Sequence, residues 1–284
     1  MLNCFFVSDL HGRRSRYETL FKQISLERPQ IVFLGGDLLP AFGRFSDEYH
    51  ENFLQDFLFQ GLKSIREELG KDYPKVFLIF GNDDIRTEEA TAIELEQHGL
   101  WFYAHNRWFT FEEFSICGYA YVPPTPFRLK DWERYDVSRY VDPGCIAPAE
   151  GTHTTPVAES VLNYATIHQD LQILSEGKDL SKTIFLFHAP PHKTNLDRAA
   201  LDGKKIDHVP LDVHVGSIAI RRFIEARQPL VTMHGHIHES ARLTGSWRDR
   251  IGSTHLFSAA YDGPELALVR FNVNDLGGAT RDIL

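Results

Sequence analysis

The stretch NCFFVSDLHG, residues 3–12, joins a short apolar run to a group of polar side chains that follows it directly. The run CFFV, residues 4–7, is too short for a buried helix, and its composition is typical of a buried strand. Asp9 and His11 come at the point where such a strand ends. The same arrangement recurs along the chain, and it predicts both the fold and the position of a functional site.

Four further apolar runs have the composition of buried strands: IVFL (31–34), VFLIF (76–80), IFLF (184–187) and LVTM (230–233). Helical periodicity follows each of the first three strands, over residues 15–28, 46–69 and 87–98. Ser46, Asp47 and Thr87 are the expected N-caps of the second and third helices. Because strands and helices alternate, the sequence predicts a parallel or mostly parallel sheet.

The pattern changes after residue 100. Residues 100–121 alternate more and contain no long helix, so they predict antiparallel strands, and residues 255–273 predict two strands around an Asp-Gly-Pro turn. Two irregular excursions are expected at about 122–156 and 189–215, with a helix over 157–176 between them. The chain shows no repeat and no linker, so residues 1–284 are expected to form one domain.

Composition limits the classes of function. The 284 residues are 43% hydrophobic and 24% charged, which is typical of a globular protein, and the net charge is −9. That charge argues against general binding of nucleic acid or of an anionic membrane. Three dispersed cysteines, no signal-peptide pattern and no apolar window of 18 residues favour a cytoplasmic protein, either a monomer or a homo-oligomer.

Polar side chains follow all five apolar runs: Asp9, His11, Asp37, Asn82, Asp83, Asp84, His188, His234, His236 and His238. Taken singly, each has an ordinary structural interpretation; Asp37 after two glycines is equally a cap, and Gly81-Asn82 is equally a tight turn. In an open α/β sheet, however, ligands bind at the carboxyl ends of the strands. Their common placement therefore predicts a metal site at that edge.

The motifs D-x-H, G-D, G-N-x-[DE], a lone H and G-H-x-H, in this order, resemble those of the calcineurin-like metallophosphoesterases. They extend from about residue 4 to residue 240. The resemblance implies two packed mixed β-sheets flanked by helices, an α/β four-layer sandwich. It also implies a dinuclear metal centre with a first metal bound by Asp9, His11 and His238, a second bound by Asn82, His188 and His236, and Asp37 as the bridge.

The ligand chemistry agrees with this implication. Mixed nitrogen and oxygen donors suit Mn²⁺, Fe, Zn²⁺, Ni²⁺ or Co²⁺ rather than a calcium site. Two divalent ions against two carboxylates leave a local charge of about +2, which would attract a phosphate ester to an acidic protein. The resulting hypothesis is hydrolysis of a small phosphomonoester or phosphodiester by a metal-bridging hydroxide. No protein nucleophile is required, so Ser8 is expected to be structural.

One motif departs from the family pattern. Many relatives have histidine after Gly-Asn, where this chain has Asp83, and residues 36–44 lack the second aspartate, and with it the aspartate–arginine pair, of the protein-phosphatase branch. A carboxylate there would repel a phosphate unless it were protonated or compensated by metal. Asp83, His192 and Arg86 are the candidate catalytic residues, and His214 is a further candidate for proton transfer to the leaving group.

Three other features leave two interpretations open. Gly216-Ser217 opens a helix whose N-terminus either binds phosphate or is simply capped. Phe127, Trp132 and Tyr135 either stack on a base or pack in the protein. His234 matches no ligand position and is expected to support its neighbours by a hydrogen bond or by packing.

Three alternative functions compete with the phosphoesterase. A non-catalytic interaction module would be expected to have lost ligands, whereas this chain has them all. A nuclease-type phosphodiesterase is disfavoured by the net acidity and the absence of a basic stretch. Another metal hydrolase, such as an amidohydrolase, often begins with His-x-His, whereas this chain begins with Asp-x-His and ends with His-x-His.

Overall fold

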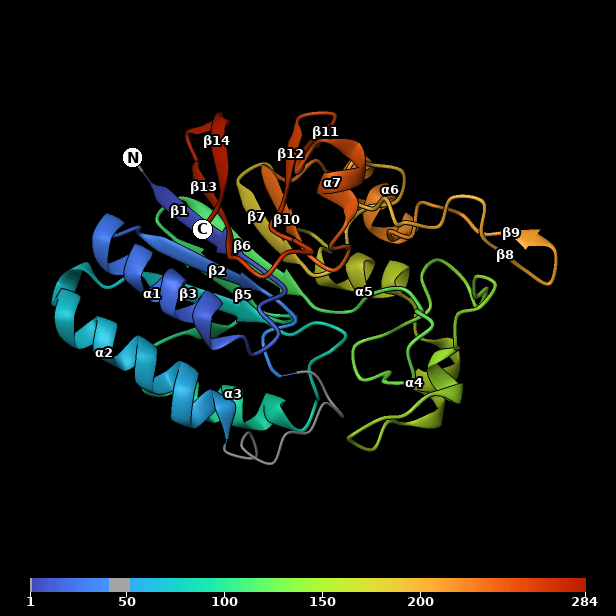
Figure 1. Ribbon diagram of the computed structural model, residues 1–284, viewed down its shortest axis with the longest axis horizontal. Coiled ribbons are helices and arrows are strands. Elements are labelled where there is room, and N and C mark those ends of the chain that lie inside the picture. Colours follow the sequence, from blue (N-terminus) through green and yellow to red (C-terminus); the bar gives the residue numbers. More distant parts are fainter. Residues whose placement is uncertain (1, 41–51) are drawn as a thin grey trace.

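The computed structural model describes residues 2–40 and 52–284, in which two six-stranded sheets pack against each other (Figure 1). The first sheet has the order β14-β13-β1-β2-β3-β4. Its strands are β1 (Asn3–Val7), β2 (Ile31–Gly35), β3 (Lys75–Ile79), β4 (Phe102–Tyr103), β13 (Ala267–Asn272) and β14 (Asp275–Ile283). Strands β1 to β4 are parallel, and the β13–β14 hairpin adds antiparallel strands at one side.

The second sheet has the order β11-β12-β10-β7-β6-β5. Its strands are β5 (Trp108–Phe111), β6 (Phe114–Tyr119), β7 (Thr183–Phe187), β10 (Val231–His234), β11 (Arg248–Ile251) and β12 (Thr254–Ser258). The four central strands are parallel, and the edge strands β5 and β11 are antiparallel to their neighbours. Both sheets are therefore mixed.

Aromatic side chains fill the space between the sheets. The ring of Phe257 on β12 lies 5.5 Å from that of Phe271 on β13, and Phe77 on β3 lies 5.4 Å from Phe109 on β5. All four rings belong to the hydrophobic core or pack against it. Burial of such rings is a large stabilising contribution, and here it holds the two sheets face to face.

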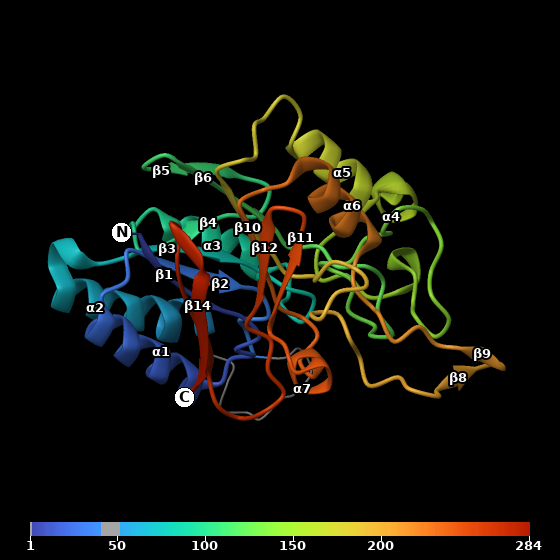
Figure 2. The ribbon, with the colours of Figure 1, turned by 90° about the horizontal axis from the view of Figure 1, so that it is seen from above.

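Helices cover the outer faces of the two sheets (Figure 2). The helices are α1 (Arg14–Glu27), α2 (Gln60–Leu69), α3 (Glu88–Glu96), α4 (Glu159–Tyr164), α5 (Ile167–Leu174), α6 (Ile218–Arg227) and α7 (Ser240–Thr244), with a π-helical segment η1 (Phe53–Phe59) directly before α2. Helices α1, α2 and α3 lie beside the first sheet, whereas α5 and α6 lie beside the second. The predicted α/β sandwich of two mixed sheets flanked by helices is confirmed.

The five predicted strands are β1, β2, β3, β7 and β10, and the predicted helices at 15–28 and 87–98 are α1 and α3. Ser46 and Asp47, the expected caps of the helix over 46–69, lie outside the described residues. Asn52 caps η1, since its side chain accepts a hydrogen bond from the Gln55 N–H. Thr87 precedes α3 but makes no capping hydrogen bond with its side chain.

The expectations about the later strands and helices were met only in part. Within 100–121 an antiparallel pair, β5 and β6, is present as predicted, but β4 pairs in parallel with β3 and β6 with β7. Two strands, β12 and β13, flank the Asp-Gly-Pro turn as predicted, and they belong to different sheets. The helix expected over 157–176 is two helices, because Ala165 is extended and Thr166 caps a new helix by accepting from the Gln169 N–H.

The two excursions contain little regular structure. Residues 122–156 hold isolated bridges and one 3₁₀ turn, η3 (Pro148–Glu150), and a fully buried Lys130–Glu133 ion pair lies at their centre. Residues 189–215 include a small hairpin, β8 (Lys205–Ile206) and β9 (Val209–Pro210), which projects from the rest of the protein (Figure 1).

Candidate metal centre

Seven potential metal ligands lie just beyond the carboxyl ends of five strands. Asp9 and His11 follow β1, Asp37 follows β2, Asn82 follows β3, His188 follows β7, and His236 and His238 follow β10. The first three strands belong to one sheet and the last two to the other. Packing of the two sheets thus brings side chains that are distant in sequence to a common edge.

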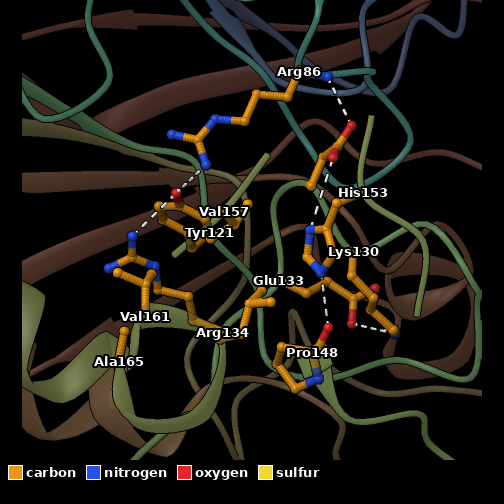
Figure 3. A pocket seen from close by; sticks show the side chains of 12 residues that line it. Arg86, Tyr121, Lys130, Glu133, Arg134, Pro148, His153, Val157, Val161 and Ala165 are labelled. Carbon is orange, nitrogen blue, oxygen red and sulfur yellow. Dashed lines mark hydrogen bonds and ion pairs between the residues drawn. The ribbon is translucent and has the colours of Figure 1, made fainter. Parts of the chain in front are cut away.

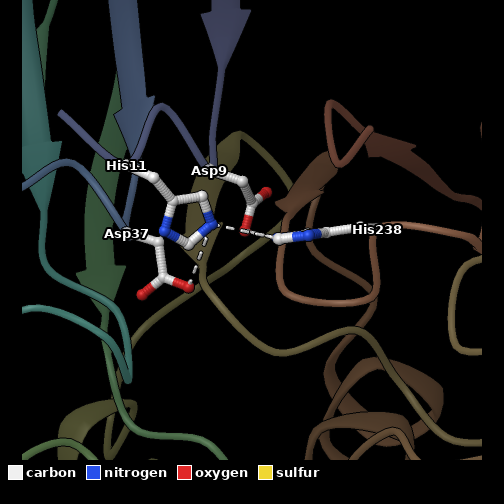
Figure 4. Close-up of side chains that lie close together, drawn as sticks. All are labelled: Asp9, His11, Asp37 and His238. Carbon is white, nitrogen blue, oxygen red and sulfur yellow. Dashed lines mark hydrogen bonds and ion pairs between the residues drawn. The ribbon is translucent and has the colours of Figure 1, made fainter. Parts of the chain in front are cut away.

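Asp9, His11, Asp37 and His238 form the first group, and one donor atom from each lies within 4.8 Å of the others (Figure 4). The Nε2 atom of His238 is 3.3 Å from Asp9 Oδ1 and 3.2 Å from His11 Nε2. The Nε2 atom of His11 lies 4.0 Å from Asp37 Oδ2. The imidazole nitrogens and carboxylate oxygens of this group therefore converge on one small volume, as ligands of a single ion do.

Asp37, His188 and His236 form the second group by the same criterion. The Nε2 atom of His188 lies 3.2 Å from Asp37 Oδ2 and 3.1 Å from Asn82 Oδ1. The other ring nitrogen, Nδ1, lies 2.8 Å from the Gly35 carbonyl oxygen, to which it donates. That hydrogen bond fixes the ring and leaves Nε2 to bind a metal, as is usual for histidine ligands.

Several ligands adopt backbone conformations that side chains other than glycine rarely take. The φ angles are +56° at Asp9, +48° at His11, +52° at Asp37 and +74° at His236. Each such residue costs about 1–3 kcal/mol, and they gather where surrounding structure holds strain for function. Their clustering at one edge is independent support for a functional site there.

The backbone at position 235 lies so close to the Asp9 side chain that only glycine fits there. A Cβ atom at this position would lie 2.7 Å from Asp9 Oδ2. Its absence lets the next residue, His236, donate its backbone N–H to Asp9 Oδ1 over 2.9 Å. The Ser8 hydroxyl also donates to the Asp9 carboxylate, so it supports a ligand, as expected for a structural serine.

The charges of these buried groups depend on one another. Burial would raise the pKa of Asp9 and Asp37, but His238 beside Asp9 and His188 beside Asp37 hold both pKa values below the usual range. Burial would lower the pKa of His188, yet Asp37 raises it to about 10. Burial lowers the pKa of His236 to about 3. Ionised carboxylates and neutral imidazoles are the forms that bind metal ions, so a bound metal would have to displace the proton that Asp37 stabilises on His188.

Asp83 and Asp84 take different positions. The Oδ2 atom of Asp83 lies 3.5 Å from His11 Nδ1, and 37% of its side chain is exposed. Burial, with Asp37 nearby, raises the pKa of Asp83 to about 6. Asp84 is fully buried and accepts hydrogen bonds from the N–H groups of Leu38, Leu39 and Gly81. It thereby joins the loops after β2 and β3, a role that sequence reasoning missed although the motif included the residue.

Arg86 does not reach the metal ligands through any contact recorded among residues 2–40 and 52–284. Its guanidinium donates to the Tyr121 hydroxyl over 3.0 Å (Figure 3). It also pairs with Glu89 and lies over the Trp132 ring. Its backbone N–H donates to Asp131. These contacts join the loop after β3 to the 122–156 excursion and favour a structural role for Arg86.

His192 and His214 also bind residues outside the two ligand groups. The Nε2 atom of His192 lies 3.5 Å from Asp212, and Nδ1 of His214 lies 2.8 Å from Asp197. Both pairs lie within the 189–215 excursion. Catalytic roles for His192 and Arg86 stay predictions, without a supporting contact in the described parts of the chain.

Of the features that left two interpretations open, the N-terminus of α6, Trp132, Tyr135 and His234 have ordinary structural roles, whereas Phe127 is not packed in the core. Asp136 accepts hydrogen bonds from the Ser217 hydroxyl and from the N–H groups of Ile218 and Ala219, so the N-terminus of α6 is capped. Trp132 and Tyr135 are buried, whereas Phe127 is exposed. His234 is buried and hydrogen-bonds to the Ala189 carbonyl oxygen and the Thr232 hydroxyl, and it is not part of either ligand group.

The residues present fit a pair of divalent ions. Four imidazoles, two carboxylates and one amide converge as two groups that share Asp37, and nitrogen and oxygen donors of this kind suit first-row transition metals. Fold and site together define a two-sheet α/β protein with a candidate dinuclear metal centre at the carboxyl edge of its strands.

The sequence supplies the family. A family description of calcineurin-like phosphoesterases matches residues 2–240, so the chain belongs to the calcineurin-like phosphoesterase family. Membership implies a phosphoric ester hydrolase, and members of the family depend on two metal ions. Among curated proteins no sequence match was found.

Solved structures agree on the fold. The protein TT1561 of Thermus thermophilus is similar with a TM-score of 0.59 at 14% identity, over 99% of this chain and 98% of that one. A dimetal phosphatase from Danio rerio is similar with a TM-score of 0.51 at 14% identity, over 95% of this chain and 91% of that one. At such identities the likeness concerns the fold alone. In the described residues, no helix is both long and apolar enough to span a membrane.

Proposed function

We propose that this protein is a dinuclear metal-dependent phosphoesterase that hydrolyses a small phosphomonoester or phosphodiester. The observation that carries the proposal is Asp37, whose carboxylate belongs to both groups of candidate ligands. Its Oδ2 atom lies 4.0 Å from His11 Nε2 and 3.2 Å from His188 Nε2, so this carboxylate faces both groups. The first ion would be held by Asp9, His11 and His238 and the second by Asn82, His188 and His236, with Asp37 between them.

The donor set and the buried charges support this assignment. Two carboxylates against two divalent ions leave about +2 of local charge, which favours a phosphate ester in a chain of net charge −9. The mixed donors favour Mn²⁺, Fe, Zn²⁺, Ni²⁺ or Co²⁺. When bound, two such ions would polarise the phosphoryl group and activate a water molecule for in-line attack.

The chain's own residues orient this chemistry. His188 is held by Gly35 through Nδ1, and Asp9 is held by Ser8 and by the His236 N–H, so contacts within the protein orient both ligands. Such preorganisation avoids the cost of ordering side chains during the reaction. Ser8 donates to Asp9 and has no hydrogen bond to a histidine within residues 2–40 and 52–284, so we assign it no nucleophilic role.

Asp83 is our candidate for proton transfer to the leaving group. Its partly exposed carboxylate lies next to His11, and its N–H donates to Asp37 Oδ1 over 2.8 Å. A competing role is to orient His11 by accepting from its Nδ1–H, in the way that carboxylates support histidine ligands. The two roles can be distinguished by experiment, because replacement of Asp83 should lower the metal affinity only if Asp83 orients His11.

Substrate size and cellular context complete the proposal. The two excursions, about 122–156 and 189–215, would restrict access and select a small ester. All three cysteines are free and two are buried, which suits a reducing cytoplasm. We further propose that residues 1–284 form one domain and that the chain acts as a monomer or homo-oligomer without nucleic-acid or membrane partners.

The experiment is metal-supplemented hydrolysis by pure protein that has first been freed of metal with a chelator. p-Nitrophenyl phosphate and bis-p-nitrophenyl phosphate are supplied with Mn²⁺, Ni²⁺, Co²⁺ or Zn²⁺, followed by a nucleotide panel. We expect turnover only after metal addition. The relative rates on the two esters then distinguish a monoesterase from a diesterase.

His236 and His234 provide a matched pair of variants. His236→Asn should abolish turnover, whereas His234→Asn should retain it, because an asparagine amide can still donate to the Ala189 carbonyl oxygen. Absence of turnover on every ester with every metal would contradict the proposal and favour a binding module. Equal loss in the two variants would contradict the ligand assignment.

A further inference from the structure

Arg16 lies on the buried side of α1, in a position where an apolar side chain would be expected. Leu20 and Ile24 follow it at intervals of four residues, which place all three on one face of the helix. Only 5% of Arg16 is exposed. A buried arginine is costly unless its donors are satisfied, so its presence here requires a specific reason.

The guanidinium of Arg16 donates to three main-chain oxygens. One is the carbonyl oxygen of Asp9, a candidate ligand; the others are those of Gly263 and Pro264, the Pro264 contact being 3.3 Å long. Every hydrogen bond recorded for Arg16 in the described residues goes to a carbonyl group rather than to a carboxylate. Its contacts therefore fix backbone positions and do not form an ion pair.

These contacts join two segments that are far apart in the sequence. Asp9 lies in the loop after β1, in the left-handed conformation that directs its carbonyl toward α1. Gly263 and Pro264 lie in the loop that connects β12 to β13, outside the residues 2–240 that match the family. Arg281 on β14 donates to the Ala260 carbonyl oxygen in the same loop. The C-terminal segment is thus linked directly to the ligand loop.

We propose that Arg16 is a positioning residue that holds Asp9 in its metal-binding conformation. Its guanidinium does so by donating both to the Asp9 carbonyl oxygen and to carbonyl oxygens of the β12–β13 loop. This inference rests on the proposed dinuclear centre and assigns part of its geometry to residues beyond the family match. Outer partners of metal ligands commonly change affinity by about 10- to 100-fold. The effect should be largest at the first metal, because the loop that carries Asp9 and His11 is the ligand-bearing loop to which the Arg16 guanidinium donates.

An electrostatic role and a positioning role of Arg16 predict opposite changes in metal affinity when the residue is replaced. Removal of a buried cation near Asp9 would, by electrostatics alone, strengthen the binding of a divalent cation. Loss of positioning would weaken it. Arg16→Gln removes the charge, whereas Arg16→Lys keeps the charge but cannot reach three carbonyl groups, so the two variants separate the two effects.

The test is calorimetric titration of metal-free protein with Mn²⁺, together with the electron paramagnetic resonance signal of coupled Mn²⁺ pairs. Arg13→Gln is the matched control, since Arg13 is the exposed residue just before α1 and its guanidinium makes a long, 3.5 Å contact with the Gly263 carbonyl oxygen. His238→Ala identifies which binding step belongs to the first metal. Urea unfolding of each metal-free variant measures stability separately.

We expect Arg16→Gln and Arg16→Lys to weaken the first site about tenfold or more, with the second site and the Arg13→Gln control unchanged. If Arg16→Gln does not fold, Arg16→Lys decides. Equal weakening of both sites, unchanged binding or tighter binding would overturn the inference. Fewer than two Mn²⁺ bound to the wild-type chain would instead overturn the proposed function, so the two failures are distinct.

Discussion

Single residues in this site are held in place by hydrogen bonds to their neighbours. Asp84 is the clearest example, since two carboxylate oxygens accept three backbone N–H groups from the loops that carry Asp37 and Asn82. The sequence placed Asp84 in the G-N-x-[DE] motif, but it did not predict that this side chain joins the two loops. The contact could not be predicted because it depends on how the loops after β2 and β3 lie relative to each other.

Replacement of Asp84 by alanine should leave three buried N–H groups without an acceptor. At about 1 kcal/mol or more for each, the free energy of unfolding should fall by roughly 3 kcal/mol. Urea denaturation measures it, with Asp207→Ala in the exposed β8–β9 hairpin as control. A loss no larger than that of the control would show that these hydrogen bonds do not hold the two loops.

Asp83→Asn separates proton transfer from orientation of His11. As a proton donor, Asp83 should matter most for a poor leaving group, so kcat on phenyl phosphate should fall about 100-fold or more. The rate on p-nitrophenyl phosphate should fall less, and the metal content should stay the same. An unchanged pH–rate profile would remove Asp83 from the mechanism. Weaker metal binding would instead show that Asp83 orients His11.

At the scale of elements, strands with a consistent apolar run were predictable and edge strands were not. The strands β1, β2, β3, β7 and β10 are buried along nearly their whole length, and their composition shows it. Strand β14 has two glycines and is mostly exposed, so its sequence carries no such pattern. Pairing of β4 with β3 depends on a long-range contact that local alternation does not reveal.

Helix α6 begins at a cap that comes from a distant segment. Asp136 accepts from Ser217 Oγ over 2.5 Å and from the Ile218 N–H over 2.7 Å. Asp136→Ala should lower the free energy of unfolding by about 1–2 kcal/mol, whereas Asp136→Asn should cost less because it keeps an acceptor. Chemical denaturation of both variants measures the difference, and equal stability of Asp136→Ala and wild type would refute the capping role.

His105, just after β4, links stability to pH. Burial lowers its pKa to about 3, and its Nδ1 accepts from the Ala120 N–H, so the folded protein holds the neutral ring. The unfolded chain has the ordinary pKa of about 6.5 and binds more protons between these values. The stabilising contribution is therefore complete above about pH 6.5 and is lost as the pH falls toward 3.

His105→Phe should make the stability of the protein less dependent on pH in this range. The slope of the unfolding free energy between pH 4 and 6 should decrease by up to about 1.4 kcal/mol per pH unit. Slopes rather than absolute stabilities are compared, because the variant also loses the Ala120 hydrogen bond. The exposed His208→Gln is the control, and equal slopes in all three proteins would contradict this assignment.

At the scale of the whole molecule, both sheets contribute to a single site. The first sheet contains N-terminal strands together with the C-terminal hairpin β13–β14, which supports our proposal that residues 1–284 form one domain. The candidate ligands were predictable because each follows a recognisable strand in a fixed order. Their division into two groups, with Asp37 shared between them, came from the family resemblance, and in the structure Asp37 belongs to both groups of candidate ligands.

The number of divalent ions bound per chain tests the central claim most directly. Metal-free wild type and Asp37→Asn are equilibrated with Mn²⁺, and bound metal is counted by elemental analysis after removal of free ion. We predict two ions per wild-type chain and loss of the dinuclear state in Asp37→Asn, whose amide cannot bridge two cations as a carboxylate does. One ion or none in the wild type, or two ions retained in Asp37→Asn, would contradict the account.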